Sequence, residues 1–417
     1  MLRRALKVLG PGLIAGASDD DPSGVGTYAV AGASFGYATL WTAWVTFPMM
    51  AATQVIAAKI AIVTGRGLAG LLCRYYPSWI GYAAALALAI ACTITAGADL
   101  GAIAAALNLM LPVPASALVV PIALILIAVQ VWGSYRFMAR VFTGLAAALL
   151  AYIGAAVLAK PDVAEVVRRT LIPTLRFDRP FLLTLVAILG TTISPYLWFW
   201  QASQEVEEMV SKGQRRLWQR RGATNAELRY VTWDVNVGMA FSNVVMYFII
   251  LASAATLFAS GRSEIASARE AAEALRPVAG AAASTLFALG LIGSGLLAVP
   301  VLTGSAAYAV GEVFGWRVGF DRRLPQATGF YGVVVASTLV GTLINFLGIN
   351  PIDALFGSAV IFGFLAPPIL AVMMVMANDP RIMGHRVNGV GLNVLGWAMT
   401  LVMALAAIAL IVASVAR

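Results

Sequence analysis

The sequence predicts an all-α membrane protein with about eleven transmembrane helices, arranged as two inverted five-helix repeats and one extra helix. Three observations support this: an apolar composition, apolar runs of membrane-spanning length, and paired interruptions in the first and sixth runs. Of the 417 residues, 61% are hydrophobic and only 11% are charged. Because a typical soluble domain has about 25% charged residues, the composition excludes a soluble helical protein with an apolar interior.

The apolar residues gather in runs of about 20, each long enough to cross a hydrocarbon core roughly 30 Å thick. No connection between the runs is long enough to fold alone, so we predict a single transmembrane domain over residues 1–417. The longest connections lie near residues 160–180, 210–229 and 260–279. The expected spans are residues 8–36, 39–64, 80–108, 115–134, 139–159, 181–209, 230–259, 280–308, 326–347, 351–377 and 389–415.

The net charge of +9 would suggest nucleic-acid binding on a soluble protein. Here the basic residues lie between the apolar runs, so they indicate topology, because cytoplasmic loops are enriched in Lys and Arg. We predict a multi-pass protein of the cytoplasmic (inner) membrane with a cytoplasmic N-terminus, embedded in the lipid bilayer and without a nucleic-acid partner. The cytoplasmic segments would then hold Arg3, Arg4, Lys7, Lys59, Arg66, Arg74, Arg136, Arg140, Lys212, Arg215, Arg216, Arg220, Arg221, Arg229, Arg317, Arg322, Arg323, Arg381 and Arg386.

Residues suited to catalysis are scarce. Cys73 and Cys92 form neither a metal-ligand spacing nor a disulfide framework, and His385 is the only histidine. We find no nucleophile–base pair, phosphate loop or metal-hydrolase motif, which disfavours an enzyme. The sequence therefore predicts no catalytic residue and no cofactor, and it gives no sign of an obligatory protein partner.

The first apolar run is interrupted by charge. Residues 18–24 read Ser-Asp-Asp-Asp-Pro-Ser-Gly, in the middle of a segment long enough to cross the bilayer. A carboxylate at the bilayer centre costs about 2.5–3.5 kcal/mol on insertion scales, and proline breaks a helix interior. This segment cannot continue as a lipid-facing helix, so we predict an unwound break.

The sixth run contains a matching interruption, because residues 190–196 read Gly-Thr-Thr-Ile-Ser-Pro-Tyr. Alone, Pro195 would indicate an ordinary proline kink. Interrupted helices at corresponding positions of two halves indicate a transporter built from inverted repeats. We therefore expect one repeat over about residues 8–159, a second over about 181–377, and an extra helix over about 389–415.

Asp21 is the strongest candidate for the substrate site. Carboxylates and the carbonyl oxygens of an unwound helix together suit a hard cation. Asp21 can also be the N-cap of the second half-helix with Pro22 at its first position, and the two roles are compatible. Asp19 and Asp20 either line a vestibule or pair locally. Asp99 is another intramembrane acid, either beside the site, on a cation or proton path, or hydrogen-bonded to a neighbouring helix.

These residues carry a family resemblance. The chain resembles the Nramp (natural resistance-associated macrophage protein) family of divalent-metal transporters, and the resemblance extends from about residue 8 to residue 400. It includes Gly10-Pro11-Gly12, Asp21-Pro22, residues 54–65, residues 73–77, Asp99-Leu100, Ala105 to Asn108, Gly190 to Pro195, Asn243, and Met383-Gly384 before Asn388. It implies the LeuT-type fold, a 5+5 inverted repeat with discontinuous helices 1 and 6.

Carried over position by position, the resemblance implies a site of the Asp21 and Ser194 side chains with the Ser18 and Thr191 carbonyls. The family's pattern in the first helix is Asp-Pro-Gly-Asn, so its amide is lost here and Gly24 leaves space for water. Its sixth helix reads Met-Pro-His, so a thioether becomes the Ser194 hydroxyl and the first histidine becomes Tyr196.

The family's second histidine in the sixth helix falls at Gln201. The family has a pair of acids in its third helix; the first is present here as Asp99, and the second is replaced by Ala102. Loss of sulfur removes the preference for soft transition metals, and a roomier site suits partly hydrated magnesium. The chain thus resembles the Nramp-related magnesium transporters, which implies Mg²⁺ as substrate, with Mn²⁺ as second choice. Loss of the histidines and of one acid implies little or no proton coupling.

One rival hypothesis stays within transport. Ser194, Tyr196 and the aromatic side chains of Trp198, Phe199 and Trp200 could build a pocket for an organic solute or organic cation, because aromatic faces attract such cations. The simpler interpretation of these aromatic residues is packing or an interfacial position. Loss of divalent binding in Asp21→Ala would support the metal hypothesis, whereas stabilisation by an organic solute would support the rival.

Overall fold

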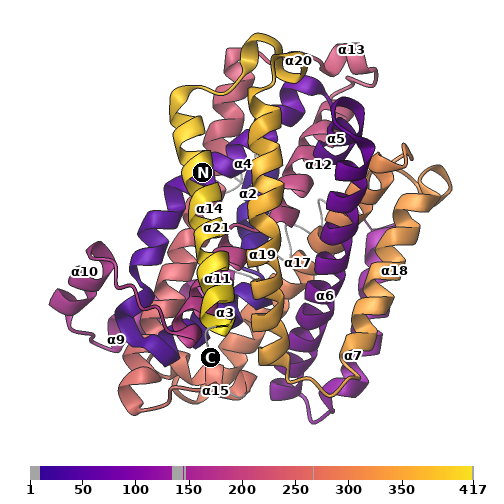
Figure 1. Cartoon of the computed structure of the whole chain (residues 1–417). Coiled ribbons are helices and arrows are strands. Elements are labelled where there is room, and N and C mark those ends of the chain that lie inside the picture. The colour runs from indigo at the N-terminus through magenta and orange to yellow at the C-terminus, as the bar shows by residue number, and fades with distance from the viewer. Residues whose placement is uncertain (1–9, 134–143, 145–146, 266, 416–417) are drawn as a thin grey trace.

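The computed structural model describes residues 10–133, 144, 147–265 and 267–415, and all regular structure in these ranges is helical. The long helices run side by side as an elongated bundle (Figure 1). Eight segments are long and apolar enough to cross a membrane, and two shorter apolar helices accompany them over residues 148–158 and 328–344. With the broken first span, these correspond to the eleven expected segments.

The crossing and half-crossing helices are α2 (Pro11–Asp19), α3 (Pro22–Phe35), α4 (Trp41–Thr64), α6 (Ser78–Met110), α7 (Ala115–Trp132), α9 (Ala151–Leu158), α11 (Arg179–Thr192), α12 (Pro195–Ser211), α14 (Asn225–Thr256), α17 (Ala283–Val313), α18 (Thr328–Ile344), α19 (Pro351–Asn378) and α21 (Val390–Val415). Short helices connect them: α5 (Leu68–Tyr75), α10 (Val163–Leu171), α13 (Leu217–Arg220), α15 (Ala268–Ala272), α16 (Arg276–Ala279) and α20 (Pro380–Met383). The 3₁₀ turns are Gly36–Thr39, Ala147–Leu150, Phe258–Ser260, Glu273–Leu275, Gly280–Ala282, Leu324–Gln326 and Gly384–Arg386.

The expected boundaries differ from the structure at a few places with local causes. The seventh span begins at Asn225 rather than near residue 230, because Thr224 and Glu227 form a reciprocal capping box. The connections near residues 160–180 and 260–279 contain short helices rather than plain loops. Part of the fifth expected span, residues 139–143 and 145–146, lies outside the described residues, as do Arg3, Arg4, Lys7, Arg136 and Arg140.

Both predicted breaks are confirmed. α2 ends at Asp19 and α3 begins at Pro22, so the chain leaves the helix at Asp20 and Asp21. α11 ends at Thr192 and α12 begins at Pro195, so the second break is Ile193 and Ser194. In each case proline occupies the first position of the new half-helix, where its missing N–H needs no partner.

The loops gather at two ends of the bundle. At one end, shown at the top of Figure 1, α5, α13 and α20 lie together; the backbone of Gly222 bonds to Val63, and Tyr76 bonds to Asp379. We call this the basic end, because its loops hold Arg66, Arg74, Lys212, Arg215, Arg216, Arg220, Arg221, Arg381 and Arg386. At the opposite end lie α10 and α15, and α21 finishes there (Figure 1).

The two half-helices that precede the breaks run in opposite directions. α2 starts beside the first turns of α14 at the basic end, whereas α11 starts at the opposite end. Each packs through glycine against a later helix. A Cβ at Gly16 would lie 2.2 Å from the backbone of Gly238 on α14, and one at Gly190 would lie 2.3 Å from the amide nitrogen of Gly363 on α19. Small residues permit such close helix contact in membranes.

Candidate functional site

The two breaks meet in the middle of the bundle. The Tyr196 hydroxyl, on the first turn of α12, lies 3.2 Å from the Ser18 carbonyl and 3.2 Å from Asp21 Oδ2. Two further pairs of hydroxyls link α3 to the end of α11. They are Ser23 with Thr191 at 3.4 Å, and Tyr28 with Thr192 at 3.0 Å. Residues separated by about 170 positions along the chain therefore form one polar centre.

Asp21 is the N-cap of α3, as the sequence allowed. Its Oδ1 accepts from the Gly24 amide at 2.7 Å and from the Ser23 hydroxyl at 2.6 Å, while Oδ2 accepts from Tyr196. The side chain is 1% exposed. The cap fixes the carboxylate at the positive end of the half-helix dipole and leaves Oδ2 facing α12, where a cation could be held.

Ser194 and Thr191 lie on the opposite side of this centre. The Ser194 hydroxyl lies 2.8 Å from the carbonyls of both Gly190 and Thr191, and it donates its one proton to one of them at a time. The two ligands implied for the sixth helix are thus neighbours, and the hydroxyl proton is directed to its own helix. The serine oxygen keeps its lone pairs for a cation, while its proton stays bonded to a carbonyl at the end of α11.

Gly24 has less free space around it than its missing side chain suggests. A Cβ at this position would come within 3.1 Å of the Thr191 hydroxyl and 3.4 Å of the Asp19 carbonyl. The glycine therefore lets α3 and α11 approach each other. Room for water at Gly24 remains a prediction, and it requires the two half-helices to separate slightly.

Asp19 and Asp20 turn toward α14. The Ser242 hydroxyl lies 2.6 Å from Asp19 Oδ2 and 3.2 Å from Asp20 Oδ1, and both acids are at most 1% exposed. A hydroxyl has one proton, so it donates to one of these oxygens at a time. The geometry matches local pairing more closely than an open vestibule.

Asp99, on α6, is completely buried, and neither of its carboxylate oxygens has a hydrogen-bond partner among the described residues. The Ser23 backbone on the neighbouring helix α3 interacts with the Asp99 carboxylate at longer range, so the alternatives for this acid stay open. Asp99 lies close enough to Asp21 for the two carboxylates to interact electrostatically. Asp99 is a second buried carboxylate beside the first break.

Gln201 lies between one and two helical turns after Tyr196 on α12, toward the basic end. Its amide accepts from Gln54 at 3.3 Å and donates to Glu205 at 2.7 Å. These contacts place it between the polar centre and the basic end, and its role on a cation pathway stays a prediction.

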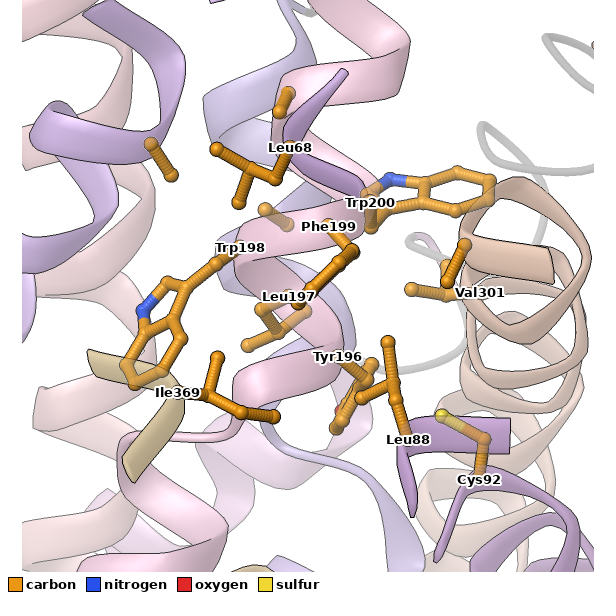
Figure 2. Close-up of a cluster of buried hydrophobic side chains, with 14 of the residues drawn as sticks. Leu68, Leu88, Cys92, Tyr196, Leu197, Trp198, Phe199, Trp200, Val301 and Ile369 are labelled. Atoms are coloured by element: carbon orange, nitrogen blue, oxygen red, sulfur yellow. The ribbon is translucent and has the colours of Figure 1, made fainter. Parts of the chain in front are cut away.

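The aromatic side chains of α12 do not form one pocket. Trp198 and Trp200 extend from opposite sides of the helix (Figure 2), and residues 196–200 are all at most 2% exposed. Tyr196 packs against Phe362 with ring centroids 5.3 Å apart, and Trp200 packs against Tyr308 at 5.9 Å. Each ring fills a different part of the core, which agrees with a packing role.

Sequence reasoning missed two residues of α14. Ser242 holds Asp19 and Asp20, and Asp234 accepts from the Gly12 amide at 2.7 Å at the start of α2. An acid inside an otherwise apolar span was a visible signal for Asp234. Ser242 gave no signal, because a serine in a transmembrane helix commonly bonds its own backbone.

The polar centre is closed to both sides. The side chains of Ser18, Asp21, Thr191, Ser194 and Tyr196 are each at most 2% exposed. In the described part of the chain, no three His, Cys, Asp or Glu side chains converge closely enough to hold a metal ion. A cation at this centre would therefore be bound by one or two carboxylates together with carbonyl and hydroxyl oxygens.

A protein-family model described as natural resistance-associated macrophage protein-like matches residues 12–413. The chain belongs to the Nramp family. The match covers both breaks and nearly all of the described helices, so the resemblance seen in the motifs holds over the whole transmembrane domain.

Solved structures agree with the Nramp assignment at the level of fold. A manganese transporter of Eremococcus coleocola, in complex with an aromatic bis-isothiourea substituted compound, superposes with a TM-score of 0.77 at 19% identity, covering 98% of this chain and 86% of that one. A nucleobase-cation-symport-1 family transporter, closed around bromovinylhydantoin, gives a TM-score of 0.60 at 14% identity, covering 97% and 93%. This Nramp chain therefore has the LeuT-type fold that the family resemblance implied.

Proposed function

We propose that the protein carries a divalent cation across the cytoplasmic membrane by alternating access, with Mg²⁺ as the preferred ion and Mn²⁺ second. The observation that supports this most directly is the convergence at Tyr196. Its hydroxyl is 3.2 Å from both Asp21 Oδ2 and the Ser18 carbonyl, so a carboxylate and a freed carbonyl face one buried point. Opposed oxygens at the break of a discontinuous helix suit cation binding.

The charge balance of the centre favours the same function. Asp19, Asp20, Asp21 and Asp99 are all at most 1% exposed, and no ion pair in the described ranges involves any of them. A buried carboxylate without a counterion is costly. A divalent cation bound at Asp21, with Asp99 nearby, would compensate two of these charges.

The chemistry of the ligands distinguishes the candidate ions. The proposed donors, from Asp21, Ser18, Thr191 and Ser194, are all oxygen atoms. Hard oxygen ligands suit magnesium, which also keeps several of its own waters, whereas thioether ligands select softer metals. The solved Eremococcus coleocola relative is a manganese transporter, which supports a divalent substrate. The serine at position 194 is our reason for placing Mg²⁺ ahead of Mn²⁺.

We propose that uptake needs little or no proton coupling. The membrane potential alone supplies roughly 4.6 kcal/mol for a divalent ion at 100 mV. The clustering of basic loops at one end of the bundle supports a cytoplasmic basic end and hence a cytoplasmic N-terminus. Equal magnesium uptake under opposite imposed pH gradients is the expected result. Acidification of the vesicle lumen that follows uptake would overturn uncoupled transport.

The decisive experiment is uptake into proteoliposomes of Mg²⁺, Mn²⁺, Ca²⁺ and tetraethylammonium by wild type, Asp21→Asn and Ser194→Met. Asparagine keeps the N-cap acceptor but removes the charge, so Asp21→Asn should lower divalent uptake by about 100-fold or more while the protein stays folded. Ser194→Met should shift the preference toward Mn²⁺. Uptake of the organic cation with no divalent uptake would replace our proposal by the organic-substrate alternative.

A further inference from the structure

An apolar groove lies between four helices, and Phe199 of α12 forms part of its wall. It has a volume of about 350 Å³ and is lined by side chains of α5, α6, α12 and α19, all of them apolar. That volume is within the range of small-molecule sites. Its walls include Leu72, Trp79, Ala87, Phe199, Ile369 and Met373.

Small side chains and a proline create the hollow. On α6, Ala83, Ala84 and Ala87 present only methyl groups along one face of the helix. Opposite them, Pro368 interrupts the regular hydrogen bonding inside α19. Larger residues at the alanine positions would fill the groove, so its volume is determined by the sequence of α6.

The groove continues into the outer apolar surface of α6. Trp79, which lines it, is 70% exposed, and Leu86 and Ile90 on the same helix are 62% and 53% exposed. In a protein that crosses a membrane, such a surface faces lipid. Water is disfavoured in a hollow without polar partners, whereas acyl chains are present along the whole of this surface.

We propose that the groove binds an acyl chain of a membrane phospholipid. Phe199 forms part of its wall and lies three residues after Tyr196 on α12 (Figure 2). The Tyr196 hydroxyl in turn contacts Asp21. Ile369 of α19, which also lines the groove, lies against α12 in the same view. A chain in the groove therefore packs directly on the half-helix that closes the cation centre and stabilises its present position.

The test is photo-crosslinking in vesicles of phosphatidylethanolamine and phosphatidylglycerol that contain a phosphatidylglycerol with a diazirine on its acyl chain. Wild type is compared with Ala87→Phe, which fills the groove, and with the matched control Ile90→Phe on the outer surface of α6. Labelling of groove residues is normalised to labelling of α21, which is largely exposed. Ala87→Phe should lower the normalised labelling by roughly fivefold or more, and Ile90→Phe should leave it unchanged.

Thermal unfolding in detergent with added phosphatidylglycerol is the second measurement. Wild type and Ile90→Phe should gain stability from the lipid, whereas Ala87→Phe should start more stable and gain little, which also shows that it folds. Equal labelling of all three proteins, or an equal gain in stability, would overturn the site. Neither measurement involves cation transport, so this proposal and the proposed function can fail independently.

Discussion

The two half-helices that precede the breaks are held in different ways. The N-cap of α11 is Asp178, whose own side chain accepts from the Phe181 amide at 3.0 Å. The N-cap of α2 is Gly10, which has no side chain, and the Gly12 amide instead donates to Asp234 of α14 at 2.7 Å. The start of α11 is thus encoded locally, whereas the start of α2 depends on a contact with a residue more than 200 positions away.

The breaks themselves differ in the same direction. The first has three carboxylates, at Asp19, Asp20 and Asp21, whereas the second contributes only neutral oxygens from Thr191, Thr192 and Ser194. The first break therefore supplies negative charge to the centre, and the second supplies neutral oxygen atoms. This division predicts that changes on the two sides of the centre have unequal consequences.

We expect the largest loss of stability from changes at the glycines through which both half-helices pack. Gly16→Ala and Gly190→Ala should each cost about 3 kcal/mol or more of unfolding free energy, because the new Cβ would meet backbone atoms at 2.1–2.2 Å. Chemical denaturation in detergent measures this. Gly357→Ala is the control, since nothing lies within 4 Å of its Cβ position. A clearly smaller loss of unfolding free energy for Gly16→Ala than for Gly190→Ala would mean that α2 can shift to accommodate the new methyl group and that α11 cannot.

Removing the two caps tests local against distant stabilisation. Asp234→Ala should cost about 2 kcal/mol, at the upper end for a helix cap, because its acceptor is largely buried; Asp178→Ala should cost about 1 kcal/mol. Asp234→Asn keeps an acceptor oxygen and should recover most of the loss. Melting temperatures of the three variants are sufficient. Equal losses for Asp234→Ala and Asp178→Ala would contradict the asymmetry.

The hydroxyl that joins the breaks should have a moderate effect on binding. Tyr196→Phe removes the group that fixes Asp21 Oδ2 relative to the Ser18 carbonyl, so divalent affinity should fall by about tenfold, typical of a hydrogen bond to a charged group. Calorimetric titration of Mg²⁺ measures the change. Tyr28→Phe, which removes a hydroxyl bonded to Thr192, should change affinity by less than about threefold. Similar losses in both variants would show that the two links are equivalent.

The smallest effect comes from an acid that has a counterion. The Arg381 guanidinium lowers the pKa of Asp379 from 3.8 to about 2. Because the pKa is lower in the folded state, the stabilisation is full above about pH 4 and is lost as the pH falls toward 2. Arg381→Gln should therefore lower stability by less than about 1 kcal/mol at pH 7, and the difference should vanish near pH 2. Melting curves across this range would contradict the pairing if the difference stayed constant.

The sequence predicted the parts of the centre that depend on neighbours in the chain. Asp21 precedes Pro22, and Ser194 precedes Pro195, so the breaks, the cap and the two half-helices follow from local rules. The contacts of Asp234 and Ser242 could not be predicted, because they depend on how α2 packs on α14. The direction of the Ser194 hydroxyl was equally hidden, since it is set by the carbonyls that α11 leaves free at its end.

Ser242 has one hydroxyl proton for two buried carboxylates, and this affects the rates that we expect for exchange and for net transport. The hydroxyl serves both carboxylates, and Asp19 Oδ1 and Asp20 Oδ2 have no hydrogen-bond partner in the described ranges. Under the alternating access proposed above, the empty protein changes conformation around these buried acids without a cation to compensate them, whereas the loaded protein does so with the cation bound. Exchange of labelled for unlabelled ion should therefore run faster than net accumulation, and the rate of turnover should depend on the ion waiting on the far side.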